Sequence, residues 1–263
     1  MCLLTFLPAG TLPDTEALRT GTETNDDGHG FAIVTDSGLL VEHGLDAEAT
    51  ISAFAALRRR HPEGPALFHS RFGTHGDSGS VENCHPLVVG GDSRTVLAHN
   101  GVFPEAVRPA KGDPRSDTRI VAEEFLPGFG TLRRRRTRLA FQRWMTPGNK
   151  VVILTVDPRF RDNAYILNED AGVWDGGIWY SNRDYLPSPP SRLRWTYRST
   201  GRLWDDDRIK ELGWREPVQC WICETDLASA EDPCPVCGHC LGCGEFPEDC
   251  ACYVPASFGT RTA

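Results

Sequence analysis

The sequence predicts an α+β protein with layered β-sheets, followed by a small module rich in cysteine. Two observations support this division of the 263 residues. Residues 1–185 alternate short apolar runs with turns rich in glycine and aspartate, and only two stretches there have helical character. Eight of the 10 cysteines then fall between Cys220 and Cys252.

Four apolar runs are the strongest strand candidates, because they are short, rich in β-branched and aromatic residues, and bounded by turn formers. Several strands with few helices are typical of sheets stacked in layers. The runs cover residues 30–35, 65–72, 94–103 and 150–156.

Two stretches carry helix signals. One begins at Asp46, a suitable N-cap, and ends at Arg60 in a run of arginines that suits the negative end of the helix dipole. The other begins at Ser116 or Asp117, either of which can cap it. We expect Pro127 to end that second helix.

A stretch rich in proline and serine, residues 186–194, marks a boundary, because this composition is typical of linkers. Beyond it, residues 201–214 can form a short helix. We therefore expect four parts: a main domain over residues 1–185, a linker with a short helix over 186–215, a cysteine-rich module over 216–255 and a tail over 256–263.

The charge and hydropathy of the chain exclude some classes of protein. A formal net charge of −8 argues against a surface that binds nucleic acid globally. No apolar run is long enough for a membrane span and no signal peptide is recognisable, so we expect a cytoplasmic protein. The basic run Arg133–Arg138 can bind nucleic acid or an acidic partner, although a solvated helix face is the plainer interpretation.

Cys2 follows the initiator methionine directly. Removal of Met1 would leave a residue with both a thiol and an α-amine, and this amine, with a pKa near 8, can accept the thiol proton. A catalytic N-terminal nucleophile needs no other base. The alternative interpretation is a small buried residue at the start of an edge strand.

Three later positions have a structural and a chemical interpretation. Asn100 and Gly101 form a turn signal, but an amide and a glycine N–H can also hold an oxyanion. Arg71 is either a surface charge or a bidentate partner for a carboxylate. Asp117 is either a helix cap or a partner for an ammonium group.

The order and spacing of the motifs resemble those of the class II glutamine amidotransferases, whose glutaminase domain is an N-terminal nucleophile hydrolase. The resemblance covers about residues 2–185. The matching motifs are Cys2, Asp27–Gly30, His69–Gly76, Asn83–Pro86, His99–Gly101 and Ser116–Thr118.

The resemblance implies a four-layer αββα sandwich and a glutaminase. Cys2 would attack the side-chain amide of glutamine, and its α-amine would take the thiol proton. Asn100 and Gly101 would donate hydrogen bonds to the oxyanion. Arg71 would pair with the carboxylate of the substrate and Asp117 with its ammonium group. The remaining pocket residues would be Thr74, His75 and His85.

The chain departs from the family pattern in three respects. Leu3 and Leu4 stand where Gly-Ile is usual, and Gly73 replaces the commoner alanine. Residues 186–263 are too few for the fused domain that uses ammonia in these enzymes. We therefore expect a separate synthase or transferase subunit to accept the ammonia.

Two other functions remain open at this stage. One is an amidase or acylase that uses Cys2 on a substrate other than glutamine, although Arg71 and Asp117 argue against the apolar pocket that an acylase needs. The other is a non-catalytic adaptor that docks through its cysteine-rich module.

The cysteine-rich module has the paired C-x2-C spacing of a small zinc-ribbon-like module. We expect one or two structural zinc ions, with His239 as a possible replacement for one thiolate. An iron–sulfur cluster is the alternative, because four of the cysteines follow one another at x2 intervals. The candidate ligands are Cys220, Cys223, Cys234, Cys237, Cys240, Cys243, Cys250 and Cys252.

Overall fold

The computed structural model describes residues 2–73, 76–187, 218–219 and 226–227. The described residues up to 187 belong to one compact unit. Strands β11 (Val218–Gln219) and β12 (Asp226–Leu227) belong to a second unit and pair with each other in antiparallel fashion. The short helix expected over 201–214 lies outside the described residues.

The first unit contains a six-stranded antiparallel sheet with the strand order β3-β2-β4-β1-β10-β9. Its strands are β1 (Leu3–Leu7), β2 (His29–Thr35), β3 (Gly38–Gly44), β4 (Ala66–Ser70), β9 (Val173–Asp175) and β10 (Ile178–Tyr180). Strand β1, which follows Cys2, pairs on both sides with β4 and β10. The edge-strand interpretation of Cys2 is therefore wrong, because local sequence does not reveal pairing with strands far along the chain.

A four-stranded antiparallel sheet, in the order β5-β6-β7-β8, is the second sheet of this unit. Its strands are β5 (Leu87–Val89), β6 (Asp92–Asn100), β7 (Lys150–Thr155) and β8 (Ala164–Leu167). All four apolar runs predicted as strands are therefore strands. Two of the strands end before the predicted run does, because β4 ends at Ser70 and β6 ends at Asn100.

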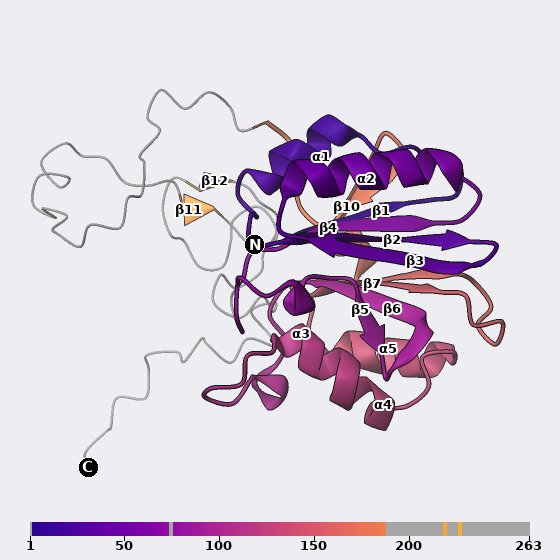
Figure 1. Cartoon of the computed structure of the whole chain (residues 1–263). Helices are drawn as coiled ribbons and strands as arrows, with labels where there is room; N and C mark the ends of the chain where they lie inside the picture. The colour runs from indigo at the N-terminus through magenta and orange to yellow at the C-terminus, as the bar shows by residue number, and fades with distance from the viewer. Residues whose placement is uncertain (1, 74–75, 188–217, 220–225, 228–263) are drawn as a thin grey trace, which may run out of the picture. The chain divides into compact units, whose positions relative to one another are not determined.

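Helices cover the outer face of each sheet, so the first unit has four layers (Figure 1). Helices α1 (Thr15–Thr22) and α2 (Ala47–Arg60) lie over the six-stranded sheet. The four-stranded sheet is covered by α3 (Asp117–Ile120), the π-helical turn η3 (Val121–Phe125), α4 (Leu126–Phe129) and α5 (Arg135–Trp144). Short 3-10 turns occur at η1 (Val81–Asn83), η2 (Glu105–Val107) and η4 (Glu169–Ala171).

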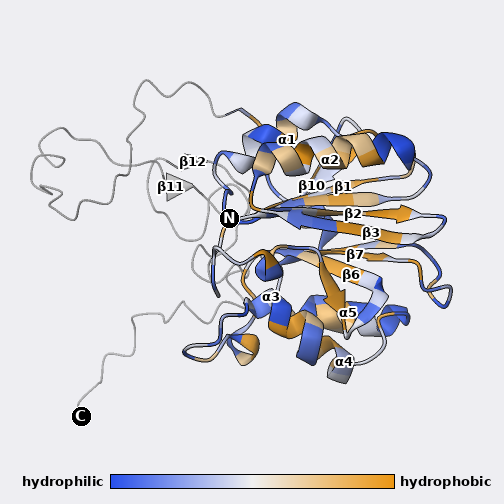
Figure 2. Cartoon of the chain, viewed as in Figure 1, coloured by the Kyte–Doolittle hydropathy of each residue, from blue (hydrophilic) through white to orange (hydrophobic). Residues whose placement is uncertain are grey.

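Three apolar layers hold this arrangement together, because side chains of a strand alternate between its two faces. In β1, Leu3 and Leu7 pack toward the helices, whereas Leu4 and Phe6 pack between the sheets. Figure 2 shows the resulting pattern of hydrophobic strands inside and hydrophilic helix surfaces outside. The described residues thus form a mixed α/β unit with two stacked antiparallel sheets.

The predicted N-cap of α2 is confirmed, since the Asp46 carboxylate accepts a hydrogen bond from Ala49 N at 2.9 Å. Ser116 caps α3 in the same way by accepting from Arg119 N at 3.1 Å. The prediction that Pro127 ends the second helix is wrong. The π-helical turn η3 shifts the hydrogen-bonding pattern, so the proline falls in the first turn of α4, where a missing N–H costs little.

A buried arginine closes the C-terminal end of α2. Arg58 is 0% exposed, and its guanidinium donates hydrogen bonds of 2.5–2.9 Å to four backbone carbonyls. These carbonyls belong to Pro8, Thr11, His61 and Gly64. One side chain therefore ties together the loop after β1, the end of α2 and the loop before β4.

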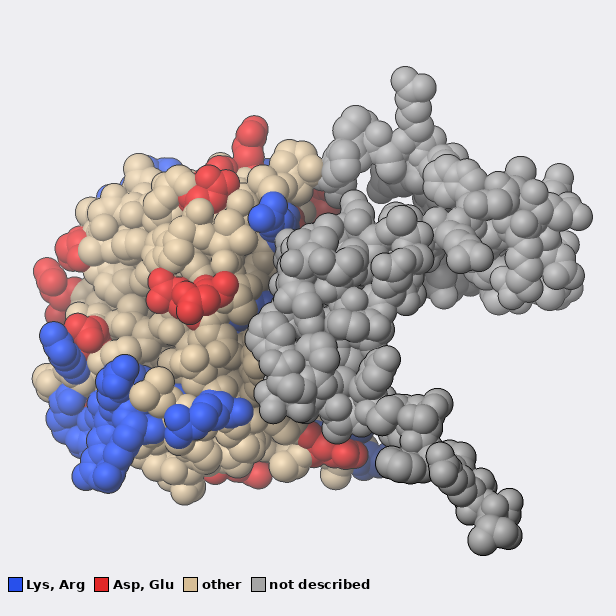
Figure 3. Space-filling model, turned by 180° about the vertical axis from the view of Figure 1, so that it is seen from behind, with Lys and Arg blue, Asp and Glu red and all other residues tan. Residues whose placement is uncertain are grey.

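The predicted basic run lies at the start of α5. Arg133–Arg136 are exposed, whereas the Arg138 guanidinium stacks over the Tyr165 ring at 3.8 Å from its centroid. Figure 3 shows Lys and Arg side chains gathered on one part of the back face of the molecule. The expectation of a solvated helix face fits Arg133–Arg136.

Candidate active site

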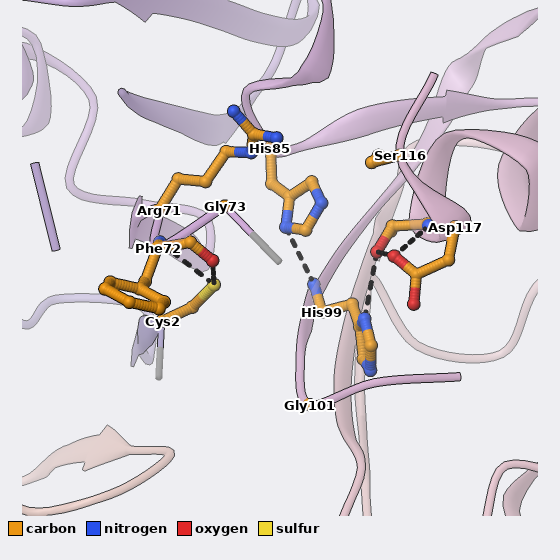
Figure 4. Close-up of a pocket in the computed structure, with 10 residues that line it drawn as sticks. Cys2, Arg71, Phe72, Gly73, His85, His99, Gly101, Ser116 and Asp117 are labelled. Atoms are coloured by element: carbon orange, nitrogen blue, oxygen red, sulfur yellow. Dashed lines mark hydrogen bonds between the residues drawn. The ribbon is translucent and has the colours of Figure 1, made fainter. Parts of the chain in front are cut away.

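A pocket open to solvent brings several of the predicted site residues together (Figure 4). It contains Cys2, Arg71, His85, Gly101 and Asp117, which come from segments far apart in the sequence. The remaining lining residues are Phe72, Gly73, His99, Ser116 and Thr118. Thr74 and His75 lie outside the described residues.

Cys2 is half-buried at the start of β1, and its sulfur contacts the backbone after β4. Phe72 N–H donates to Cys2 Sγ at 3.3 Å, and the thiol is 3.5 Å from the carbonyl of the same residue. Burial raises the pKa of the Cys2 thiol, and the Phe72 hydrogen bond opposes this only in part. The thiol therefore needs a nearby base to become an effective nucleophile.

The segment after β10 fixes the strand that carries Cys2. Asn182 Nδ2 donates to the Cys2 carbonyl at 2.9 Å, and Ser181 N donates to the Leu4 carbonyl at 2.8 Å. Sequence analysis did not identify Ser181 or Asn182 as site residues. These two residues reach the site only because β10 pairs with β1, and local sequence patterns do not predict that pairing.

Arg71 lies at the end of β4, with its side chain buried against the pocket. Its Nη1 donates to the carbonyls of Asp77 at 3.2 Å and Ser78 at 3.0 Å. A Cβ on Gly73 would lie 3.2 Å from Arg71 Nη2, which is a tight contact. The glycine that departs from the family pattern therefore leaves room for this guanidinium.

The glycine turn before β2 supports the same strand end. The Asp27 carboxylate accepts from Gly73 N at 2.7 Å, and the carbonyl of Gly28 accepts from Arg71 N at 2.8 Å. Gly28 has φ 133°, and a Cβ there would lie 2.3 Å from Cys84 Sγ. This motif therefore shapes the backbone around the pocket, because only glycine fits the turn.

Asp117 places a carboxylate in the pocket without acting as the helix cap. Its Oδ2 accepts from Phe103 N at 2.9 Å and its Oδ1 from Thr118 N at 2.8 Å. Ser116 supplies the cap instead. Asp117 and Arg71 thus bring opposite charges to the walls of one pocket.

Asn83, in the motif before Pro86, links two loops beside the pocket. Its amide donates to the carbonyls of Pro114 at 2.8 Å and Asp77 at 3.1 Å. Its Oδ1 accepts from Ser116 N at 3.0 Å. This asparagine is fully buried and holds the segment that carries the acidic side of the site.

Three buried histidines lie side by side, and two of them, His85 and His99, line the pocket. The His99 backbone N–H donates to His85 Nδ1 at 3.3 Å, so the ring proton of His85 is on Nε2. His69 Nε2 lies 3.0 Å from the same His85 Nδ1 and 3.0 Å from the His99 carbonyl. Burial lowers the pKa of His69 to about 3, that of His99 to about 4 and that of His85 well below its usual value.

His99 is held by one neighbour at each ring nitrogen. Asn149 donates to Thr146 Oγ1 at 3.0 Å through its amide nitrogen, so its Oδ1 accepts from His99 Nε2 at 2.8 Å. His99 Nδ1 then accepts from the Thr118 hydroxyl at 2.9 Å. Gly101, with φ 139°, passes close to this network, and a Cβ there would lie 2.4 Å from Asn149 Oδ1.

Asn100 does not line the pocket and is fully buried at the end of β6. Its Nδ2 lies 2.8 Å from Ser181 Oγ. Its Oδ1 has no hydrogen-bond partner among the described residues. The expected oxyanion donors are therefore adjacent in the chain, but only Gly101 contributes to the pocket wall.

The predicted metal ligands, all eight cysteines from Cys220 to Cys252, lie outside the described residues. In the part of the chain that is described, no three His, Cys, Asp or Glu side chains form a group suited to a metal ion. The helices described for this chain include none that is both long and apolar enough to cross a membrane.

Comparison with known proteins gives no match to a family model or to a curated protein sequence. One similar solved structure is glutamine phosphoribosylpyrophosphate (PRPP) amidotransferase from B. subtilis complexed with ADP and GMP. It shares 15% identity at a TM-score of 0.44, over 68% of this chain and 41% of that chain. A second, described as the allosteric regulatory enzyme of purine biosynthesis, has the same identity and coverage at a TM-score of 0.37.

The present chain therefore spans less than half the length of these two proteins. At this degree of similarity, the motifs and the geometry of the pocket carry the functional assignment.

Proposed function

We propose that this chain is a glutaminase of the class II amidotransferase type, which hydrolyses the side-chain amide of glutamine through a thioester on Cys2. One observation carries the proposal: the half-buried thiol of Cys2 shares a pocket with Arg71 and Asp117. Arg71 suits the α-carboxylate of an amino acid and Asp117 its α-ammonium.

The reaction would begin after removal of Met1. The α-amine of Cys2 takes the thiol proton, the sulfur forms a bond to the amide carbon, and the carbonyl electron pair moves onto oxygen. The α-ammonium then returns its proton to the nitrogen as the C–N bond breaks, which releases ammonia. Water attacks the thioester, its proton passes through the α-amine to sulfur, and the C–S bond breaks to give glutamate.

The oxyanion formed in both steps needs hydrogen-bond donors in fixed positions. We assign this role to the Gly101 N–H and the Asn100 amide, which follow one another at the end of β6. The histidines in and beside the pocket are neutral because burial lowers their pKa values, so they add no positive charge that competes with Arg71 for the carboxylate.

The charged walls also favour glutamine over the substrate of an acylase. An acylase pocket needs apolar walls for its acyl chain, whereas this pocket contains buried Arg71 and Asp117. N-acetylglutamine tests this difference, because it keeps the side-chain amide and the carboxylate but lacks the ammonium group. We expect kcat/KM to be at least about 30-fold lower for N-acetylglutamine than for glutamine.

We further propose that the ammonia passes to a separate synthase or transferase subunit, and that the cysteine-rich module binds one or two structural zinc ions. The Cys-x2-Cys spacing supports the zinc assignment.

Glutamate release by protein lacking Met1 tests the glutaminase directly. Cys2→Ala should lower kcat by at least about 1,000-fold, because the nucleophile is lost. Cys84→Ala is the matched control, since Cys84 is buried and does not line the pocket. Equal activity of wild type and Cys2→Ala, or an equal loss in Cys84→Ala, would reject the assignment.

A further inference from the structure

Ser181 is the point at which the nucleophile strand and the candidate oxyanion donor meet. Ser181 is 0% exposed and comes directly after Tyr180, the last residue of β10. Leu4 N–H, two residues from Cys2, donates to Ser181 Oγ at 2.9 Å. Asn100 Nδ2 lies 2.8 Å from the same oxygen.

The groups around the Ser181 hydroxyl include a donor without an acceptor and an acceptor without a donor. With two N–H groups donating to its oxygen, the Ser181 hydroxyl proton has no acceptor among the described residues. At the same time Asn100 Oδ1, a buried carbonyl oxygen, has no partner among them. A buried amide in this condition is rare in folded proteins.

A half-turn of the Asn100 amide gives the Ser181 hydroxyl proton an acceptor without moving any other atom, and it leaves unpartnered N–H donors in place of an unpartnered oxygen. The Ser181 hydroxyl then donates to Asn100 Oδ1 while still accepting from Leu4 N–H. The amide nitrogen takes the place of the unpartnered oxygen, with both of its N–H groups available. In this arrangement each group around Ser181 has a partner, and the only unused donors are those of Asn100.

We propose that Ser181 is a positioning residue that holds the Asn100 amide with its N–H groups directed at the oxyanion of the tetrahedral intermediate. The inference rests on the proposed glutaminase function and extends it to a residue that touches neither the substrate nor Cys2. Through Leu4 the same hydroxyl fixes the strand of the nucleophile. One side chain therefore sets the distance between the attacking sulfur and the donor that stabilises the oxyanion.

This arrangement predicts an effect on kcat and little effect on KM. The oxyanion exists only in the intermediate and in the transition states beside it, so a misdirected donor weakens those states and leaves glutamine binding unchanged. Glutamine itself is held by Arg71, which donates to the Asp77 carbonyl, and by Asp117, which accepts from Phe103 N–H.

The test is steady-state glutaminase kinetics on full-length protein lacking Met1. Ser181→Ala should lower kcat about 10- to 100-fold with KM within about threefold, and Asn100→Ala should lower kcat about 100- to 1,000-fold. The loss of kcat in the double variant should stay close to that of Asn100→Ala alone, because the effect of Ser181 on the oxyanion passes through that amide. Ser70→Ala is the matched control, a buried serine whose hydroxyl has no partner among the described residues, and it should leave kcat unchanged.

If Ser181→Ala does not fold, Ser181→Cys replaces it, because the thiol preserves the packing but is a weak donor. The same loss of kcat is expected. Wild-type kcat in a folded Ser181 variant, or losses that multiply in the double variant, would overturn the inference while the glutaminase stands. Absence of glutamate release from processed wild type would overturn the proposed function, and the role of Ser181 with it.

Discussion

Two buried arginines, Arg58 and Arg71, lie at the ends of neighbouring elements and perform different tasks. Arg58 is 0% exposed and Arg71 3% exposed, and both donate to backbone carbonyls. The four carbonyls around Arg58 come from loops that it ties together. Arg71 binds two carbonyls of one loop and lines the pocket that also contains Cys2.

Burial and hydrogen bonding therefore do not by themselves mark a functional charge. Burial lowers the pKa of Arg58, a sign of a charge held for structure at the expense of solvation. Arg71 differs from Arg58 in its surroundings, because it lines a pocket together with the Cys2 thiol and the Asp117 carboxylate. Mutation of the two arginines should therefore affect different quantities.

The largest expected effect is on stability at Arg58. Arg58→Met should lower the free energy of unfolding by about 3–5 kcal/mol, because several buried carbonyls lose their donors together. Urea denaturation measures this change. Arg59→Met, at an exposed neighbouring position, is the control and should change stability by less than about 0.5 kcal/mol. Equal effects at the two positions would show that the four hydrogen bonds do not hold the loops.

Arg71→Lys should act on substrate binding. We expect KM for glutamine to rise about 100-fold, because lysine keeps the charge but loses the planar guanidinium that pairs with a carboxylate. Arg58→Lys provides the contrast, with lower stability but an unchanged KM in the folded fraction. If KM responded to both substitutions alike, the division between the two arginines would fail.

The acidic side of the pocket offers a finer contrast between two adjacent residues. Asp117→Asn should raise KM about 30-fold, because an amide cannot pair with the substrate ammonium as a carboxylate does. Ser116→Ala removes the N-cap of α3 and should cost about 1 kcal/mol of stability while KM stays constant. Both substitutions are compared by glutamine kinetics and urea denaturation, and equal changes in KM would refute the ammonium-binding role.

The last effect is a pH dependence of stability to which the buried histidines in and beside the pocket contribute. The pKa of His69 is about 3 and that of His99 about 4 in the folded protein, below the usual value of histidine, because burial disfavours the charged rings. From about pH 6.5 downward the unfolded chain binds more protons, so stability is complete above that pH and decreases as pH falls toward these values. The slope should approach about 1.4 kcal/mol per pH unit for each buried histidine.

Chemical denaturation between pH 4.5 and pH 7.5 measures this slope. His69→Gln should reduce this slope by about 1.4 kcal/mol per pH unit, which corresponds to one proton, because one buried ring no longer titrates. A slope unchanged by this substitution would mean that His69 is protonated in the folded protein.

Much of the architecture could be predicted from local patterns. The N-cap of α2 and the apolar runs of β2, β4, β6 and β7 are encoded within a few neighbouring residues. The pairing of β1 with both β4 and β10 could not be predicted, because it depends on residues about 65 and 175 positions away. The prediction that Pro127 ends the helix is wrong because the π-helical turn before it has no clear sequence signal.

The site divides in the same way. Cys2, Arg71 and Asp117 stand in motifs, and the fold brings them to one pocket. Ser181 and Asn182 stand in no motif that signals their role, and only the position of β10 beside β1 connects them to Cys2 and Asn100. Residues that hold catalytic groups from a distant strand therefore require the folded structure to be found.

Intact mass spectrometry after incubation with the glutamine analogue 6-diazo-5-oxo-norleucine tests the central claim most directly. We expect a protein without Met1 that carries one covalent adduct, located on Cys2 by peptide mapping, with labelling abolished in Cys2→Ala and slowed by free glutamine. A processed and folded protein that remains unlabelled, or that is labelled on Cys84 instead, would contradict it.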